Sequence, residues 1–187
     1  MGWTYSSIYG FGSMKQFVQQ YTYETDNVKS TALDYSVINR NILYVAVEQI
    51  IKQTGERKVT AAIVEFKFNK KEYGYKDMDE TMGPYHYSCP ERILNLLTPT
   101  TNEFALKWRS TCRERQKRTK AFVMKEGQRF IRKTSWSDTV NVVTLLRPIN
   151  KSSWVGIDEL GRQYRYSKQW LLIHNYDTEE NYFENNL

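Results

Sequence analysis

The residues of this chain best suited to chemistry are seven Lys and Arg side chains between Lys107 and Lys120. They stand against one acid, Glu114, so the segment has an excess of six positive charges, which equals the net charge of +6 of the whole chain. Arginine binds phosphate through a planar fork that can make two charge-assisted hydrogen bonds at once. Because the whole excess is concentrated in one segment, it predicts a surface for a polyanion.

The spacing of these cations places several of them on one side of a helix. At 100° per residue, an arc about 80° wide holds four of them: Arg109, Arg113, Lys117 and Lys120. Phe104, Trp108 and Cys112 fall on the adjacent arc, and we expect them to pack on the body of the protein. The helix is therefore predicted to be anchored near its start and exposed near its end.

Six cations of this helix are the candidate residues for binding nucleic acid or another polyanion: Arg109, Arg113, Arg115, Lys117, Arg118 and Lys120. Together they can neutralise about four phosphates, which predicts a slope of roughly −3 to −4 for log affinity against log salt. The alternative is a solvated helix whose charges meet acids of the protein itself or of an acidic partner, a common role of charge runs. No helix-turn-helix, zinc-finger or RNP-type pattern indicates base-specific readout, and the sequence does not distinguish DNA, RNA and an acidic protein surface as the partner.

A second candidate for chemistry is the tripeptide Glu65-Phe66-Lys67 on a predicted strand. Metal-dependent nucleases of the restriction type use such an acid-x-Lys pair with an upstream carboxylate, which Asp34 or Glu48 could supply. The alternative is ordinary surface decoration, because residues i and i+2 of a strand share one face, here the face opposite to an apolar one. A three-residue motif is weak, and we favour the second interpretation.

Potential metal ligands are present but poorly spaced. The acids of segment 77–80 resemble a calcium loop only in part, since the third ligand, the central Gly and the distal Glu are missing. His86 and Cys89 have the HxxC spacing, but a structural zinc site would also need Cys112 and the distant His174. No nucleophile elbow, P-loop or dinucleotide fingerprint occurs. We therefore expect no metal, cofactor or small-molecule substrate, and no enzymatic activity.

Composition limits the class of protein. The chain has 187 residues, of which 40% are hydrophobic and 14% aromatic, so it can bury a core. No apolar run approaches the ~20 residues that span a membrane, and the start lacks the pattern of a secretory signal. Two cysteines do not make a disulfide framework. These features predict a cytoplasmic protein without a membrane partner, and they indicate no oligomeric state.

The elements that position the candidate residues begin with an antiparallel meander. Ser13 can cap a helix that reaches about Tyr23 and covers the apolar face of the meander. Apolar and alternating residues predict three strands, at residues 31–38, 41–53 and 59–69. The following segment, 73–90, is predicted to be irregular. Pro90 then begins a short helix to Leu97.

The basic helix follows directly. Thr100 and Glu103 form a capping box, which predicts a helix from Thr101 to about Lys120. Beyond it, Gly and Pro separate five short candidate strands, at residues 128–133, 140–147, 153–157, 163–166 and 171–174. Five strands in so short a stretch predict a small SH3-like β-barrel. The acidic segment 177–187 is predicted to fray.

The predicted fold class is thus α+β, with an N-terminal antiparallel sheet and covering helix, a central helical segment and a C-terminal SH3-like barrel. The expected partition is an α+β subdomain at 1–99, a basic connecting helix at 100–121, the barrel at 122–176 and a flexible tail at 177–187. Two β-rich halves joined by the basic helix are the arrangement that we expect.

Several stretches of the sequence resemble a family of small, functionally uncharacterised proteins carried by bacterial phages and mobile elements. They are MGWT at 1–4, YGYKDMDETMGP at 73–84, the segment 89–100, and the pairs Trp108-Arg109 and Cys112-Arg113. The resemblance covers about a third of the chain and carries over no catalytic or binding residue. It implies that the protein acts on host defence machinery or on the DNA of the mobile element.

The leading hypothesis is a non-enzymatic protein that binds nucleic acid or a nucleoprotein complex through the basic helix. Its sharpest form is a mobile-element inhibitor of a host defence nuclease, of the anti-CRISPR or anti-restriction type. One alternative is a protein–protein interaction module that docks on an acidic surface of its partner. A metal-dependent nuclease built around Glu65 and Lys67 is the third hypothesis.

Overall fold

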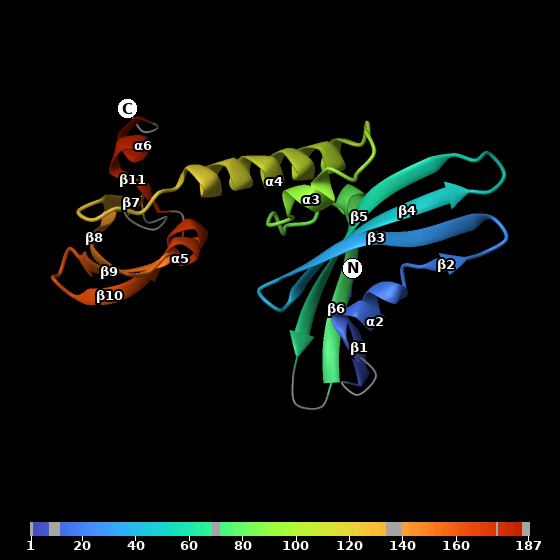
Figure 1. Cartoon of the computed structure of the whole chain (residues 1–187), viewed down its shortest axis with the longest axis horizontal. Helices are drawn as coiled ribbons and strands as arrows, with labels where there is room; N and C mark the ends of the chain where they lie inside the picture. The colour runs from blue at the N-terminus through green and yellow to red at the C-terminus, as the bar shows by residue number, and fades with distance from the viewer. Residues whose placement is uncertain (1, 8–11, 69–71, 134–139, 175, 185–187) are drawn as a thin grey trace. The chain divides into compact units, whose positions relative to one another are not determined.

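The chain folds into two compact units, Met1–Lys117 and Arg118–Leu187, each built on an antiparallel sheet. The computed structural model (Figure 1) describes residues 2–7, 12–68, 72–133, 140–174 and 176–184. The predicted mixture of helices with antiparallel sheet is confirmed. The boundary between the units follows Lys117, near the end of the basic helix, so most of that helix belongs to the first unit.

Six described strands form the curled sheet of the first unit, in the order β1-β6-β5-β4-β3-β2. Their bounds are β1 Thr4–Ser7, β2 Tyr23–Glu24, β3 Val28–Ile38, β4 Ile42–Ile51, β5 Arg57–Phe68 and β6 Glu72–Asp79. The three predicted strands are confirmed as β3, β4 and β5, although the predicted end of the last, Asn69, lies outside the described residues. The prediction of an irregular segment at 73–90 is wrong for its first part, because β6 pairs there with both β5 and β1.

Both faces of this sheet are covered, whereas one covered face was predicted. Helix α2, Met14–Gln19, is capped by Ser13 as predicted and packs Phe17 and Val18 on one face. It ends before the predicted Tyr23, where β2 begins. The opposite face packs against α3, Glu91–Leu94, and against α4, Glu103–Ala121. Burial of every residue from Ile42 to Val47 reflects this arrangement, because a central strand covered on both faces has no polar side.

Helix α4 begins two residues later than predicted. The Asn102 side-chain oxygen accepts a hydrogen bond from the Ala105 amide at 3.0 Å, so Asn102 caps the helix. The Thr100 hydroxyl instead accepts from the Asn102 amide at 3.2 Å, outside the helix. The predicted capping box of Thr100 with Glu103 is therefore wrong.

The sheet of the second unit has the order β10-β9-β8-β7-β11. Its strands are β7 Arg129–Lys133, β8 Val140–Asn150, β9 Ser153–Asp158, β10 Gln163–Ser167 and β11 Asp177–Thr178. Four of the five predicted strands are confirmed. The fifth, at 171–174, is wrong: Lys168–Ile173 is the helix α5, whose N-terminus is capped by the Ser167 hydroxyl, which accepts from the Trp170 amide at 3.0 Å. Leu171 of this helix is fully buried in the core of the unit.

The acidic tail was predicted to fray, and over its described part it contains a short strand and a helix. Asp177 and Thr178 form β11, which pairs with β7, and Glu179–Glu184 forms the helix α6. The Arg129 guanidinium donates to the Glu179 carboxylate at 2.7 Å, so charge complementarity helps to hold the tail on β7. Residues 185–187 lie outside the described residues. Among the helices that the structure describes, none combines the length and the apolar character that crossing a membrane would require.

Candidate polyanion-binding site

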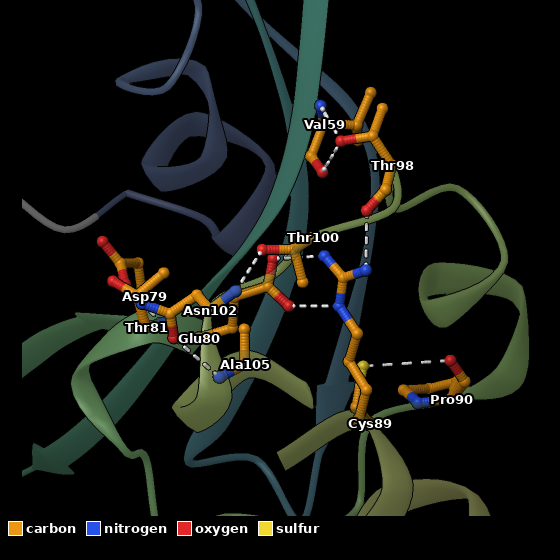
Figure 2. A network of polar contacts seen from close by, with 11 residues as sticks. Val59, Asp79, Glu80, Thr81, Cys89, Pro90, Thr98, Thr100, Asn102 and Ala105 are labelled. Carbon is orange, nitrogen blue, oxygen red and sulfur yellow. Dashed lines mark hydrogen bonds and ion pairs between the residues drawn. The ribbon is translucent and has the colours of Figure 1, made fainter. Parts of the chain in front are cut away.

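Arg109 was predicted to lie in the exposed basic stripe, but it is buried inside the first unit. The residue is 6% exposed. Its Nε and Nη2 atoms donate to the two carboxylate oxygens of Glu80, both at 2.6 Å, and Nη1 donates to the Thr98 carbonyl at 2.6 Å. Figure 2 shows that Glu80 and Thr98, the two partners of this guanidinium, lie on separate segments of the chain. Because its guanidinium is engaged on all three nitrogens, the prediction of Arg109 as a polyanion contact is wrong.

Glu80 requires a cation because its carboxylate is 1% exposed. It lies in the short 3₁₀-helix η1, Glu80–Met82, whose first turn is capped by Asp79, which accepts from the Thr81 amide at 2.7 Å. Gly83 ends this turn with a φ of +65°, a conformation that glycine adopts without strain. This turn therefore places the buried Glu80 carboxylate beside α4, where it pairs with Arg109.

The network also ties α4 to the sheet. The Thr98 hydroxyl donates to the Val59 carbonyl and accepts from the Val59 amide, both at 3.2 Å, which joins the segment before α4 to β5 (Figure 2). Trp108 donates from its indole nitrogen to the His86 carbonyl at 2.8 Å and is buried, as predicted, together with Cys112. Phe104, expected to be buried with them, is 62% exposed. Helix α4 is thus held rigidly from Ala105 to Cys112.

Two of the predicted cations, Arg113 and Lys117, lie together on the exposed side of α4. Both are exposed to solvent. They border a surface hollow of about 440 Å³, whose lining residues are Pro99, Thr100, Leu106, Arg109, Ser110, Arg113, Glu114 and Lys117. The one carboxylate in this lining, Glu114, accepts a hydrogen bond from the Ser110 hydroxyl at 2.8 Å. The hollow therefore offers two solvent-facing cations beside hydroxyl groups, a combination that suits a phosphate.

The remaining predicted cations differ in their surroundings. Arg118 donates to the Tyr176 carbonyl at 3.0 Å and lies 3.5 Å from the Asp177 carboxylate, so its guanidinium is engaged by residues of its own unit, the second. Arg115 and Lys120 are exposed, and each also takes part in interactions of its own. The six predicted residues therefore do not form one uniform surface.

The upstream carboxylates that a nuclease would need beside Glu65 and Lys67 of β5 are engaged in other ion pairs. Asp34 forms an ion pair with Arg92, and Glu48 forms one with Arg57. Glu65 accepts from the Tyr85 hydroxyl, and its carboxylate lies 3.4 Å from His86 Nε2. Burial acts to raise the pKa of Glu65, but these hydrogen bonds outweigh it and lower the pKa.

The potential metal ligands, for which no metal site was expected, have other partners or are buried. Asp77 accepts from the Tyr21 hydroxyl at 2.8 Å, and Asp79 caps η1. Cys89 and Cys112 are both buried, and burial raises the pKa of the Cys112 thiol to about 12. Within the described ranges, no three His, Cys, Asp or Glu side chains are grouped so that they could hold a metal ion.

Comparison of the chain with known proteins gives no further guide. No protein family model, curated protein or solved structure matches it. Function is therefore inferred from the charge and the geometry of the described residues alone. Among the six predicted residues, Arg113 and Lys117 combine exposure, a shared hollow and a rigid support.

Proposed function

We propose that this protein is a non-enzymatic, nucleic-acid-binding protein that contacts phosphate through Arg113 and Lys117 of α4. The single observation that carries the proposal is the hollow that both side chains border on a helix fixed by the Glu80–Arg109 ion pair. A rigid support lowers the entropy lost when a side chain is ordered on a ligand. The charge excess of the segment supports an anionic ligand over a neutral one.

The size of the surface limits the salt dependence. Arg113 and Lys117 are four positions apart, so their Cβ atoms are about 6 Å apart on one side of the helix. They can therefore hold one phosphate between them or two neighbouring phosphates. Two neutralised phosphates predict a slope of about −1.8 on duplex DNA and about −1.4 on a single strand. This value is smaller than the sequence predicts, because Arg109 is buried and Arg118 is bonded to the tail.

The sharper form of the proposal is an inhibitor of a host defence nuclease, of the anti-CRISPR or anti-restriction type, carried by a phage or mobile element. Its support is the resemblance of MGWT at 1–4 and of the block at 73–84 to such proteins. In the structure, the second of these stretches forms β6 and η1 and provides Glu80 for Arg109. The residues of that block that the structure describes therefore help to build the support for α4.

A second candidate function is a protein–protein interaction module, and the second unit favours it. We propose that this unit is a small SH3-like barrel, because β7 to β10 follow in sequence order, a short helix precedes β11, and β11 lies beside β7. Several large apolar side chains of the unit are exposed: Ile149, Leu160, Tyr164 and Trp170. Such side chains serve as anchors in protein interfaces.

Fluorescence anisotropy with labelled duplex DNA, single-stranded DNA and single-stranded RNA across a salt series tests the proposal. The double variant Arg113→Ala/Lys117→Ala should fold normally and reduce the salt slope by about 1.8 on duplex or 1.4 on a single strand. A matched control, Lys15→Ala/Lys58→Ala, removes two exposed cations elsewhere in the first unit and should bind like the wild type. Affinity that is absent at low salt, or equal for the double variant and the wild type, would sink the proposal.

A further inference from the structure

A cavity of about 520 Å³ opens on the face of the first sheet that α2 covers only in part. Gln20 and Tyr21, which follow α2, border it on one side. Its walls come from the adjacent strands β2 to β6 and from η1: Tyr23, Ser30, Val47, Gln49, Thr60, Ala61, Ala62, Asp77, Met78, Asp79 and Met82. The volume falls within the range of roughly 300–1,000 Å³ that is typical of small-ligand sites.

The charged groups of this cavity are all negative. Asp77 and Asp79 line it, and no Lys or Arg occurs among the described residues of its lining. This distribution is opposite to the positive net charge of the chain. Other acids of the described structure meet an arginine directly, among them Glu80, which meets Arg109, and Asp158, which meets Arg162.

Asp77 is exposed to solvent, and among the described residues that line the cavity no basic side chain accompanies it. Its Oδ2 atom accepts from the Tyr21 hydroxyl at 2.8 Å, which is a neutral partner. Burial raises the pKa of Asp77, and the negative charge of Asp79 raises it further, although the hydrogen bonds from Tyr21 and the Met78 amide oppose this. A cation placed in the cavity would relieve both unfavourable effects.

The other walls suit the body of an organic cation rather than a hydrated metal ion. Val47, Ala62 and Met82 provide apolar surface, and Tyr21 and Tyr23 provide rings whose faces attract a cation. The thioether of Met82, which is 56% exposed, is polarizable and adapts to an irregular ligand. Gln49 and Thr60 add neutral hydrogen-bonding groups at the sheet.

We propose that this cavity binds a small organic cation, an amine or guanidinium carried on a short aliphatic chain. The charged head pairs with Asp77 and Asp79, while the chain packs on Val47, Ala62 and Met82. This site is separate from the phosphate-binding surface of α4, since no residue lines both the cavity and the hollow. It therefore adds a ligand class to the protein that the nucleic-acid proposal does not require.

Titration calorimetry of the full chain with three ligands of equal chain length tests the charge requirement. Butylamine should bind, whereas 1-butanol and butyrate should bind at least tenfold more weakly, because they lack the positive head. Agmatine, which carries a guanidinium and an amine, should bind more tightly than butylamine by contacting both carboxylates. Equal heats for the amine, the alcohol and the carboxylate would overturn the proposal, as would no heat from either cation at millimolar concentration.

Variants locate the site. Asp77→Asn keeps the shape and the hydrogen bond to Tyr21 but removes the charge, and it should weaken amine binding at least tenfold. Asp26→Asn, an exposed acid outside the cavity, is the matched control and should bind like the wild type. Amide NMR shifts on adding agmatine should appear at Tyr21, Gln49 and Asp77. Unchanged affinity in Asp77→Asn, or shifts confined to other residues, would show that the cation binds elsewhere.

Discussion

Replacement of Arg109 by methionine should destabilise the first unit far more than any neighbouring surface substitution. The change removes three hydrogen bonds, two to Glu80 and one to the Thr98 carbonyl. Methionine is similar in length and apolar, so the core stays filled while the carboxylate loses its partner. Glu80 is 1% exposed, so water cannot replace the guanidinium without opening the fold.

The magnitude follows from the uncompensated charge. Breaking a buried ion pair by removing one partner costs about 3–5 kcal/mol. The orphaned Thr98 carbonyl would add about 1–3 kcal/mol if water could not reach it, but the two losses overlap because they share one side chain. We therefore expect a loss of about 4 kcal/mol, which is a large part of the ~5–15 kcal/mol that stabilises a typical domain.

Urea unfolding followed by circular dichroism and fluorescence measures this loss. The double variant Arg109→Met/Glu80→Leu removes both charges, and its stability should return to within about 1 kcal/mol of the wild type, because buried ion pairs replaced by apolar residues are often neutral. Arg113→Met, one turn further along α4 and exposed, is the control and should change stability by less than ~0.5 kcal/mol. The reasoning fails if Arg109→Met costs less than 1 kcal/mol, or if the double variant is as unstable as the single one.

Three further outcomes follow from the same contacts. Asn102→Ala should lower the stability of the first unit by about 1 kcal/mol, because it removes the cap of α4, whereas Thr100→Ala should cost less; urea unfolding of both variants checks the order. The pKa of Asp77 is raised in the folded state, so folding favours the protonated carboxyl group. The stability that this provides is full below about pH 4 and is lost as the pH rises through the raised pKa. Unfolding titrations should therefore show Asp77→Asn gaining stability relative to the wild type between pH 4 and pH 7. Cys89 and Cys112 are buried thiols whose pKa values burial raises, so alkylation by iodoacetamide at pH 7 should be slow until the first unit is unfolded, as mass spectrometry would show.

Local signals in the sequence account for much of the fold. Alternating or continuously apolar residues predict the strands β3, β4 and β5. The preference of serine for helix N-termini predicts that Ser13 caps α2. The unbroken apolar run from Ile42 to Val47 also indicates that both faces of the sheet are covered, although the prediction did not use it. Strand β6 was harder to predict, because Gly74, Asp77 and Asp79 have low strand propensity and pairing with β5 and β1 overrides it.

The candidate site shows where prediction from sequence ends. On a helical wheel, Arg109 and Arg113 differ by only about 40°, and nothing local separates them. The difference comes from Glu80, which lies 29 positions before Arg109 and which the pairing of β6 with β5 brings to it. A sequence-based view of α4 alone therefore counts Arg109 among the solvent-facing cations.

This distant contact also determines which cations of α4 remain available. With Arg109 held by Glu80 and Trp108 held by the His86 carbonyl, the rotation of the helix about its own axis is fixed. Fixed rotation keeps Arg113 and Lys117 on the solvent side, where both border one hollow. If Arg109→Met/Glu80→Leu restores stability but allows α4 to rotate, nucleic-acid affinity should fall even though both exposed cations are intact. The buried pair would then act as a positioning element for the binding surface, in addition to supporting the fold.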